Sequence, residues 1–256
     1  MDLHFDLEKA KMYKSQSQAI RVLTESWAEA NLFCPRCGFH RIKHFPNNRA
    51  VADFYCPACR SEYELKSKNG KIGAKIADGA YETFIKRITC DHNPDFLILS
   101  YHLSDLCVDD LLIIPKHFFT PEIAEKRRPL GDNARRAGWV GCNILFGEIP
   151  EQGKISIIQN RCAVDSNEVV AQVQKSVVLQ TSNIEARGWL MDLLNCVNQV
   201  HGDIFALDDI YRNEAMLQAR HPQNNNIRPK IRQQLQVLRD KGVIEFLGRG
   251  LYRKIF

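Results

Sequence analysis

The sequence predicts an α/β domain followed by a smaller, mainly helical domain. Three observations support this division. Helix-like and strand-like segments alternate up to about residue 180, which is typical of a mixed sheet covered by helices. Residues 178–183 then form a short polar connector that precedes three helical segments, and the chain ends in a basic segment with the pattern of a β-hairpin. We therefore expect two domains, 1–182 and 183–256.

Length and composition limit the class of protein. The chain has 256 residues, of which 45% are hydrophobic and 25% charged, as in soluble globular proteins. It contains no apolar run of ~18 residues, and the N-terminal segment lacks the apolar centre of a secretory signal. We therefore expect a cytoplasmic protein without a membrane span. Nine cysteines in such a protein argue against a disulfide framework.

The elements of the first domain follow from their periodicity. Apolar residues at helical spacing predict helices over residues 6–30 and 74–89. Short runs of apolar, β-branched or aromatic residues bounded by turn residues predict strands over 51–55, 62–66, 96–100, 111–114 and 155–158. The first two of these strands are joined by a short segment and are expected to form a hairpin.

Two Cys-x-x-C pairs in the first domain have the spacing of a zinc site. Eighteen residues separate the pairs, which consist of Cys34, Cys37, Cys56 and Cys59. Each pair forms a tight turn that presents two sulfurs to one ion, so two pairs complete a tetrahedron. Four thiolates leave no open position, and the predicted Zn²⁺ is therefore structural. The alternative is four unrelated buried thiols.

An aspartate and a Glu-x-Lys motif flank the second Cys-x-x-C pair. Side chains alternate along a strand, so Glu64 and Lys66 share a face, and Asp53 lies on the partner strand within reach. Carboxylate oxygens suit Mg²⁺, and an adjacent ammonium stabilises charge that develops on a phosphate. The pattern predicts Mg²⁺-dependent phosphodiester hydrolysis, with the zinc holding the hairpin that carries the three groups. On its own, however, Glu-x-Lys is more often surface charge.

The second domain has the element order of a winged helix-turn-helix. Helices are predicted over 185–200, 206–218 and 227–241, followed by two strands around residues 248–250. From residue 220 to 254 there are nine Lys and Arg residues against two acids, which suits a polyanion partner. Side chains on the polar face of the third helix and at the hairpin tip are candidates for DNA contact: Arg228, Arg232, Gln233, Gln236 and Arg249. Singly, each is better explained as a solvated polar residue.

A further candidate DNA contact lies in the first domain. Arg135 and Arg136 precede Trp139 in a predicted loop. Two cations beside an aromatic ring suit a surface near the DNA backbone, whereas the simpler interpretation makes Trp139 a core residue.

Four separated motifs match one known family. They are V-A-D-F-Y-C before the predicted hairpin, E-L-K-S-K after it, A-R-R-A-G-W-V-G-C-N at 134–143 and I-R-Q-Q-L-Q-V-L-R-D-K at 231–241. With them the chain resembles, over nearly its whole length, the DpnI-like methylation-dependent type II restriction endonucleases. The resemblance implies a PD-(D/E)xK nuclease core with an inserted four-Cys zinc site and a C-terminal winged-helix domain.

The resemblance also implies an activity and a set of site residues. It implies a type II site-specific deoxyribonuclease that cuts double-stranded DNA at 5′-GATC-3′ when the adenine is methylated. The metal-binding acids of the family fall on Asp53 and Glu64, its catalytic lysine on Lys66, and the tryptophan of its methyl pocket on Trp139. Ala52 stands where such nucleases usually have proline, a residue that shapes the backbone and binds no metal. We expect a monomer in solution.

Two other function classes remain open from the residues alone. A non-catalytic regulator that grips DNA through a zinc ribbon and a winged helix explains the cysteines and the basic C-terminus. It leaves the convergence of Asp53, Glu64 and Lys66 unexplained. A resolvase or repair nuclease shares the metal site but not the dependence on methylation.

Overall fold

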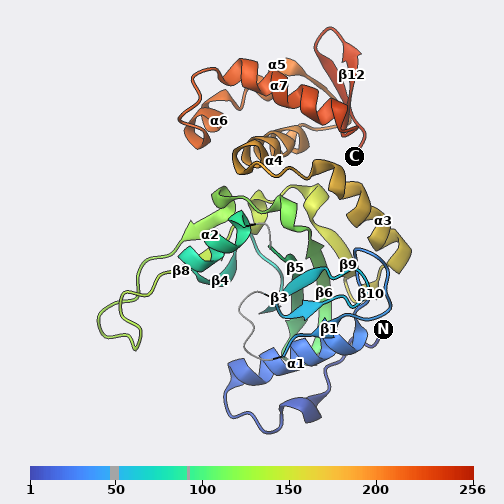
Figure 1. Ribbon diagram of the computed structural model, residues 1–256, viewed down its shortest axis with the longest axis vertical. Coiled ribbons are helices and arrows are strands. Elements are labelled where there is room, and N and C mark those ends of the chain that lie inside the picture. The colour runs from blue at the N-terminus through green and yellow to red at the C-terminus, as the bar shows by residue number, and fades with distance from the viewer. Residues whose placement is uncertain (47–51, 91–92) are drawn as a thin grey trace.

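A mixed seven-stranded sheet lies at the centre of the computed structural model, which describes residues 1–46, 52–90 and 93–256 (Figure 1). The strand order is β1-β2-β3-β5-β6-β9-β10. Strands β3 and β5 are parallel, and the other neighbours are antiparallel. The bounds are Lys43–His44, Phe54–Tyr55, Glu62–Asn69, Asp95–His102, Cys107–Ile114, Ile155–Gln159 and Cys162–Ala163.

Both faces of this sheet are buried. Along β5, Phe96 and Ile98 belong to one apolar cluster, and the alternating Leu97 and Leu99 belong to another on the opposite face. Helices α1 and α3 pack in the second cluster, whereas α2 and α4 pack in the first. Their bounds are Gln16–Asn31 (α1), Tyr81–Thr89 (α2), Ser166–Ser176 (α3) and Ile184–Gln199 (α4).

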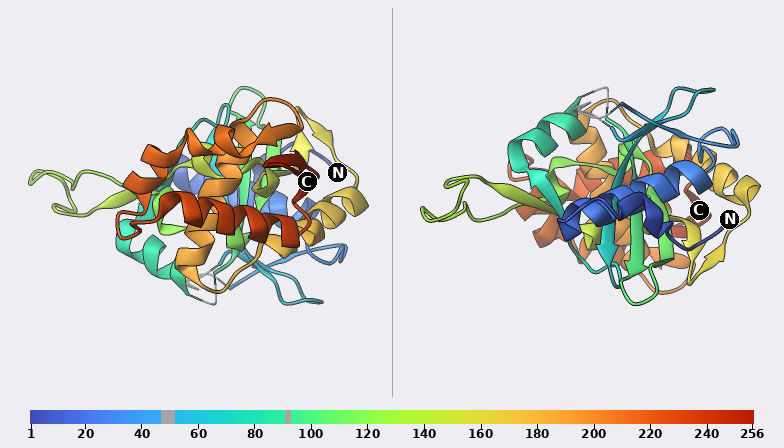
Figure 2. Two further views of the ribbon diagram at one scale, coloured as in Figure 1. Left: turned by 90° about the horizontal axis from the view of Figure 1, so that it is seen from above. Right: turned by 90° about the horizontal axis from the view of Figure 1, so that it is seen from below.

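A second, three-stranded sheet has the order β4-β8-β7. Its strands are Ile76–Ala80 (β4), Ala124–Lys126 (β7) and Gly141–Ile144 (β8). The connection between β7 and β8, residues 127–140, extends away from the body of the molecule and is called the arm below (Figures 1 and 2). Short 3-10 helices lie between these helices and strands, at Leu7–Ala10, Lys116–Phe118, Pro121–Ile123, Phe146–Glu148, Glu151–Gly153 and Val177–Leu179.

The C-terminal elements form a winged helix-turn-helix. Helix α4 is followed by β11 (Ile204–Ala206), α5 (Leu207–Tyr211), α6 (Glu214–Arg220), α7 (Ile227–Asp240) and the hairpin of β12 (Ile244–Gly248) and β13 (Leu251–Lys254). The three strands form a sheet with the order β11-β13-β12.

Helix α4 joins the two parts of the chain through one apolar core. Trp189 and Leu193 of α4 are almost fully buried, in the same cluster as Phe96 of the central sheet and Leu235 of α7. The winged helix therefore does not have a core of its own that is separate from the sheet.

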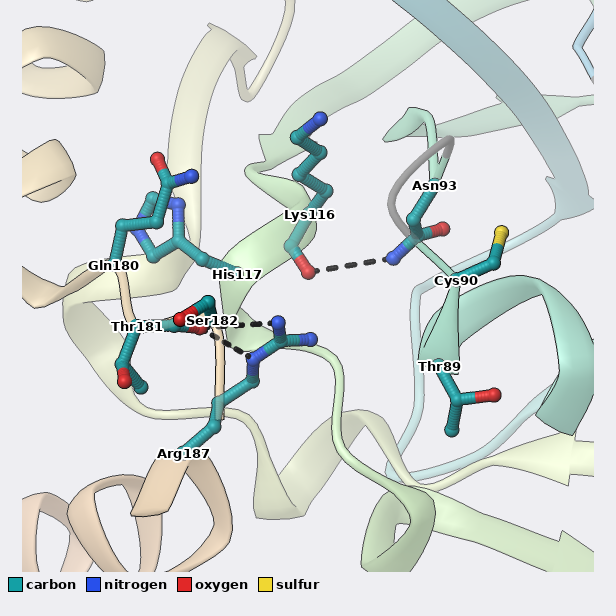
Figure 3. Close-up of a pocket in the computed structure, with 9 residues that line it drawn as sticks. All are labelled: Thr89, Cys90, Asn93, Lys116, His117, Gln180, Thr181, Ser182 and Arg187. Carbon is teal, nitrogen blue, oxygen red and sulfur yellow. Dashed lines mark hydrogen bonds between the residues drawn. The ribbon is translucent and has the colours of Figure 1, made fainter. Parts of the chain in front are cut away.

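A polar pocket of about 110 Å³ lies where the connector after α3 meets α4 (Figure 3). Arg187 of α4 crosses it and donates to the carbonyl oxygens of Thr181, Ile88 and Phe119 at 3.1–3.4 Å. His117 lines the pocket and is 2% exposed, and neither ring nitrogen has a hydrogen-bond partner among the described residues. Burial lowers the pKa of His117 to about 4.

Most predicted elements are present, and three helices differ from expectation. The helix expected over 6–30 begins only at Gln16, because residues 7–10 form a separate 3-10 turn. The first half of the helix expected over 74–89 is strand β4, which pairs with β8. The helix expected over 206–218 divides into α5 and α6 at Arg212 and Asn213.

The remaining strand predictions agree with the structure. The expected hairpin is formed by β2 and β3, but β2 comprises only Phe54–Tyr55. Ala52 and Asp53 of the predicted strand 51–55 precede β2, and Val51 lies outside the described residues. Helix α3 and strands β1, β7, β8, β10 and β11 were not predicted. Among the helices described, none combines the length and apolarity needed to cross a bilayer.

Candidate active site and DNA-binding surface

The two Cys-x-x-C turns converge on one point. The sulfur atoms of Cys34, Cys37, Cys56 and Cys59 all lie within 4.8 Å of one another, with 3.5 Å between Cys34 and Cys59 and 3.7 Å between Cys37 and Cys56. Zn–S bonds of about 2.3 Å in a tetrahedron place the sulfurs about 3.8 Å apart. The four thiols therefore fit a structural zinc ion. Within the described residues, no other set of three or more Cys, His, Asp or Glu ligand atoms is as close.

The ionisation of these thiols depends on their surroundings. Burial raises the pKa of Cys34. Burial acts in the same direction on Cys59, but hydrogen bonds to Ser61 outweigh it and lower the pKa of that thiol to about 7. A bound zinc ion favours the thiolate form of all four ligands.

The cysteine turns contact the strand that carries the candidate active site. The buried Tyr63 of β3 forms a hydrogen bond of 2.9 Å with Cys34 Sγ through its hydroxyl. Arg36, between the first two cysteines, forms a two-point ion pair with the buried Asp95 at the start of β5, at 2.5 and 2.7 Å. The cysteine site thus braces both β3 and its neighbour β5.

Asp53 lies just before β2 and faces β3. Its Oδ2 accepts a hydrogen bond of 2.8 Å from the backbone N–H of Leu65, which stands between Glu64 and Lys66. Its backbone N–H donates to Tyr63 at 2.9 Å. The antiparallel pairing predicted from the sequence therefore brings Asp53 beside the Glu-x-Lys segment.

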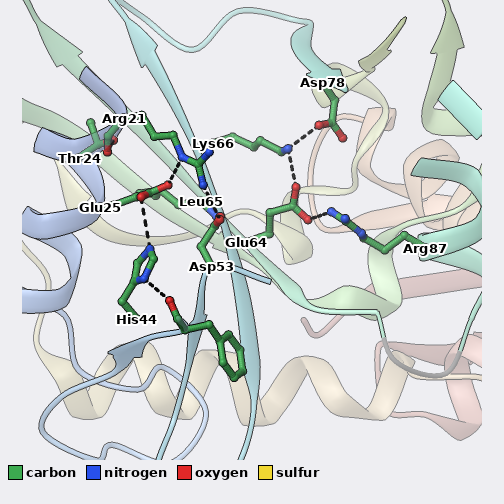
Figure 4. A network of polar contacts seen from close by, with 11 residues as sticks. Arg21, Thr24, Glu25, His44, Asp53, Glu64, Leu65, Lys66, Asp78 and Arg87 are labelled. Carbon is green, nitrogen blue, oxygen red and sulfur yellow. Dashed lines mark hydrogen bonds and ion pairs between the residues drawn. The ribbon is translucent and has the colours of Figure 1, made fainter. Parts of the chain in front are cut away.

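Glu64 and Lys66 point to the same side of β3 and touch each other (Figure 4). The Lys66 ammonium lies 2.5 Å from Glu64 Oε1 and also contacts Asp78 of β4. Arg87 of α2 pairs with the second oxygen of Glu64. These four groups form a chain of alternating charge in the order Arg87, Glu64, Lys66, Asp78.

The pKa values of Asp53 and Lys66 are both raised above the ordinary values of these groups. Burial raises the pKa of Asp53, and the nearby Glu25 charge acts in the same direction. Burial alone would lower the pKa of Lys66, but attraction to Glu64 and Asp78 outweighs it, and the pKa of Lys66 is raised. Lys66 is therefore a charged group in this site and acts as a cation.

Helix α1 adds a second set of charges beside Asp53. Glu25 accepts from Arg21 at 2.6 Å and lies 3.3 Å from Nε2 of His44. The Arg21 guanidinium reaches Asp53 Oδ1 at 3.9 Å. Figure 4 shows this set on the side of Asp53 away from Asp78.

The sequence did not single out Asp78, Arg87, Arg21 or Glu25. Asp78 was hidden because its segment has the apolar pattern of a helix. The adjacent Gly79 was a signal against a helix there, since glycine lowers helix stability by about 1 kcal/mol relative to alanine. Arg21 and Glu25 have the spacing of a helical ion pair, but nothing in the sequence placed them next to Asp53.

The predicted DNA contacts of the winged helix lie on its solvent side. Arg228, Arg232, Gln233 and Gln236 of α7 and Arg249 at the hairpin tip are all exposed. Two of the arginines are held by neighbouring groups. Arg228 pairs with Glu214 at 2.8 Å, and Arg232 donates to the Tyr211 hydroxyl at 2.9 Å.

The remaining candidates, Arg135, Arg136 and Trp139, lie on the arm. Arg135 and Arg136 are exposed. Trp139 is partly buried and belongs to neither core cluster; the Arg136 guanidinium lies 4.7 Å from its ring centroid. The ring also covers Gly141, where a Cβ would come within 2.8 Å of it. The interpretation of Trp139 as a core residue is therefore wrong.

Comparison with known families accounts for both parts of the chain. Residues 1–182 match the DpnI family, described as the Dam-replacing family, and residues 185–254 match the Dam-replacing HTH domain. Together the two matches cover nearly the whole chain. The chain thus belongs to the DpnI, or Dam-replacing, family, whose membership implies a methylation-dependent restriction endonuclease that binds DNA.

Proposed function

We propose that this protein is a type II site-specific deoxyribonuclease that cuts double-stranded DNA at 5′-GATC-3′ when the adenine is methylated. Its core would be of the PD-(D/E)xK type in residues 1–182, with a DNA-reading winged helix in residues 183–256. The observation that carries the proposal is that Asp53, just before β2, is hydrogen-bonded to β3 between Glu64 and Lys66, which contact each other.

The donor set fits a hard divalent cation. Asp53 and Glu64 offer carboxylate oxygens, and Mg²⁺ prefers one or two such ligands together with water and phosphate. When bound, Mg²⁺ supplies Lewis-acid polarisation of the phosphate and a more acidic water. Asp53 and Glu64 would hold the ion, and the Leu65 N–H keeps Asp53 in a fixed orientation for that role.

Lys66 has a separate task. Its ammonium is positively charged in the site and extends from the same strand as Glu64. A cation fixed in a partly dry site stabilises negative charge that develops on the phosphate as the bond breaks. It also orients the attacking water through its N–H donors.

The dependence on adenine methylation is best explained if both domains recognise the methylated site. Burying one methyl group is worth about 1 kcal/mol, so a single apolar pocket discriminates weakly. Trp139 on the arm offers an apolar surface, and Gln233 and Gln236 offer amides of the type that pair with adenine. If both domains read the site, their preferences multiply.

The test uses plasmids with methylated and unmethylated GATC sites, incubated with Mg²⁺. Wild-type protein should cut only the methylated plasmid, and Asp53→Ala should abolish cutting. Asp105→Asn is the matched control, because Asp105 is an exposed acid in the turn between β5 and β6, at the opposite end of β3 from Asp53. It should cut like the wild type.

The other outcomes identify competing functions. DNA binding without cutting by the wild type would favour a regulator, and equal cutting of both plasmids would favour a resolvase or repair nuclease. The contribution of the winged helix is tested by Gln233→Ala/Gln236→Ala, which should lower the preference for methylated DNA as well as the affinity. Deleting residues 183–256 is a poorer test, because the deletion also removes α4 from the core.

A further inference from the structure

The Lys66 ammonium is held between two carboxylates that come from different sheets (Figure 4). Glu64 is on the same strand, β3, and Asp78 is on β4. The Lys66 side chain is 19% exposed, and that of Asp78 is 6% exposed. The contact between Lys66 and Asp78 is therefore largely shielded from water, where a charge pair holds its geometry better than at the surface.

The two carboxylates differ in their other duties. Glu64 is a candidate metal ligand, and both of its oxygens already contact cations, Lys66 on one side and Arg87 on the other. If Glu64 turned one of these oxygens to a bound metal ion, its contact with Lys66 would weaken. Asp78 is not one of the two candidate metal ligands, so its contact with Lys66 would not compete with metal binding.

The backbone around Asp78 fixes its direction. The Gly79 N–H donates to Asp78 Oδ1 at 2.7 Å, which is the same oxygen that contacts Lys66. Asp78 pairs with Cys142 of β8, and the register of β4 and β8 shifts between Asp78 and Ala80. Irregularities of this kind redirect a side chain relative to a regular strand.

We propose that Asp78 is a positioning residue, which holds the Lys66 ammonium toward the scissile phosphate while Glu64 serves the metal ion. This inference rests on the proposed nuclease function. Lysine needs such a partner because its four-carbon stem is flexible and its ammonium has no fixed geometry. Catalytic groups lose much of their effect when they are misplaced by about 1 Å.

The test compares Asp78→Asn with a matched control, Glu125→Gln. Glu125 is a carboxylate of the same small sheet that pairs with Lys75 and Asn143 and has no contact with Lys66. In single-turnover cleavage of methylated DNA, Asp78→Asn should lower the rate constant by about 10- to 100-fold. Its Kd for the same DNA in EDTA, measured by fluorescence anisotropy, should stay within about twofold of the wild type, because the Asp78 side chain is only 6% exposed and is paired with Lys66. Asp78→Glu restores the charge and should recover part of the rate.

Several outcomes would overturn the inference. They are an unchanged rate in Asp78→Asn, an equal loss in Glu125→Gln, or a loss of DNA affinity in EDTA that accounts for the lower rate. If Asp78→Asn does not fold, Asp78→Ser, which is smaller and also neutral, takes its place in the same comparison. Failure of the proposed nuclease function gives a different result, because wild-type protein would then leave methylated DNA uncut. In that case the proposed role of Asp78 would also be wrong.

Discussion

The ion pair between Arg36 and Asp95 should be a major determinant of stability. Asp95 is 2% exposed, and its two oxygens accept two N–H groups of Arg36 and the backbone N–H of Lys116. Asp95→Asn keeps the shape but leaves the Arg36 charge partly buried without a carboxylate. Breaking a buried pair from one side costs about 3 kcal/mol or more. At about 2–4 °C per kcal/mol for a chain of this size, Tm should fall by about 6–12 °C.

The assay is thermal unfolding followed by circular dichroism, with Asp105→Asn as the control. Asp105 pairs with Arg161 at 2.8 Å, but both side chains are at least 40% exposed. Exposed pairs contribute little, so this variant should unfold within about 2 °C of the wild type. The double variant Arg36→Met/Asp95→Asn should regain part of the lost stability, because no unpaired cation is left. Equal Tm values for Asp95→Asn and Asp105→Asn would refute the reasoning.

Three further predictions concern the metal, the buried histidine and the DNA surface. The purified protein should contain one zinc ion per chain, and Cys56→Ser should lose it and unfold at lower temperature; full stability after complete zinc removal would contradict a structural role. The unfolded chain protonates His117 near pH 6.5, whereas the folded protein does so only near pH 4, so stability should drop as pH falls through that window, by about 3 kcal/mol in total. The free energy of unfolding, measured with urea at pH 7.5 and at pH 4.5, should therefore differ less for His117→Leu than for the wild type. Equal differences in the two proteins would contradict the role of His117. Arg249→Ala should weaken DNA binding similarly on all sequences and reduce the salt slope by about 1, whereas a loss confined to one sequence would point to base contact instead.

Features encoded by local spacing could be predicted from the sequence. The four cysteines lie in two short turns, so their spacing alone indicated a common site, and the sulfurs do converge. The alternation of Glu64 and Lys66 required only that β3 be a strand. The position of Asp53 beside β3 could be predicted because the turn between Asp53 and β3 is short, and a short turn fixes the pairing of the two strands.

Features that depend on distant pairing could not be predicted. Residues 76–80 have an apolar pattern compatible with a helix, and they form a strand because β8 lies beside them in the fold. Asp78 could reach the candidate site only through that pairing. Arg87 and Glu25 lie on helices that were broadly expected, but the sequence does not say which part of a sheet a helix covers.

The placement of α4 has a consequence for any shortened form of the protein. The family match to the HTH domain begins at residue 185, yet the apolar side chains of α4 fill the space above the central sheet. A fragment that ends before α4 would expose the apolar face of the central sheet to water, and it would therefore aggregate or be degraded more readily than the full chain.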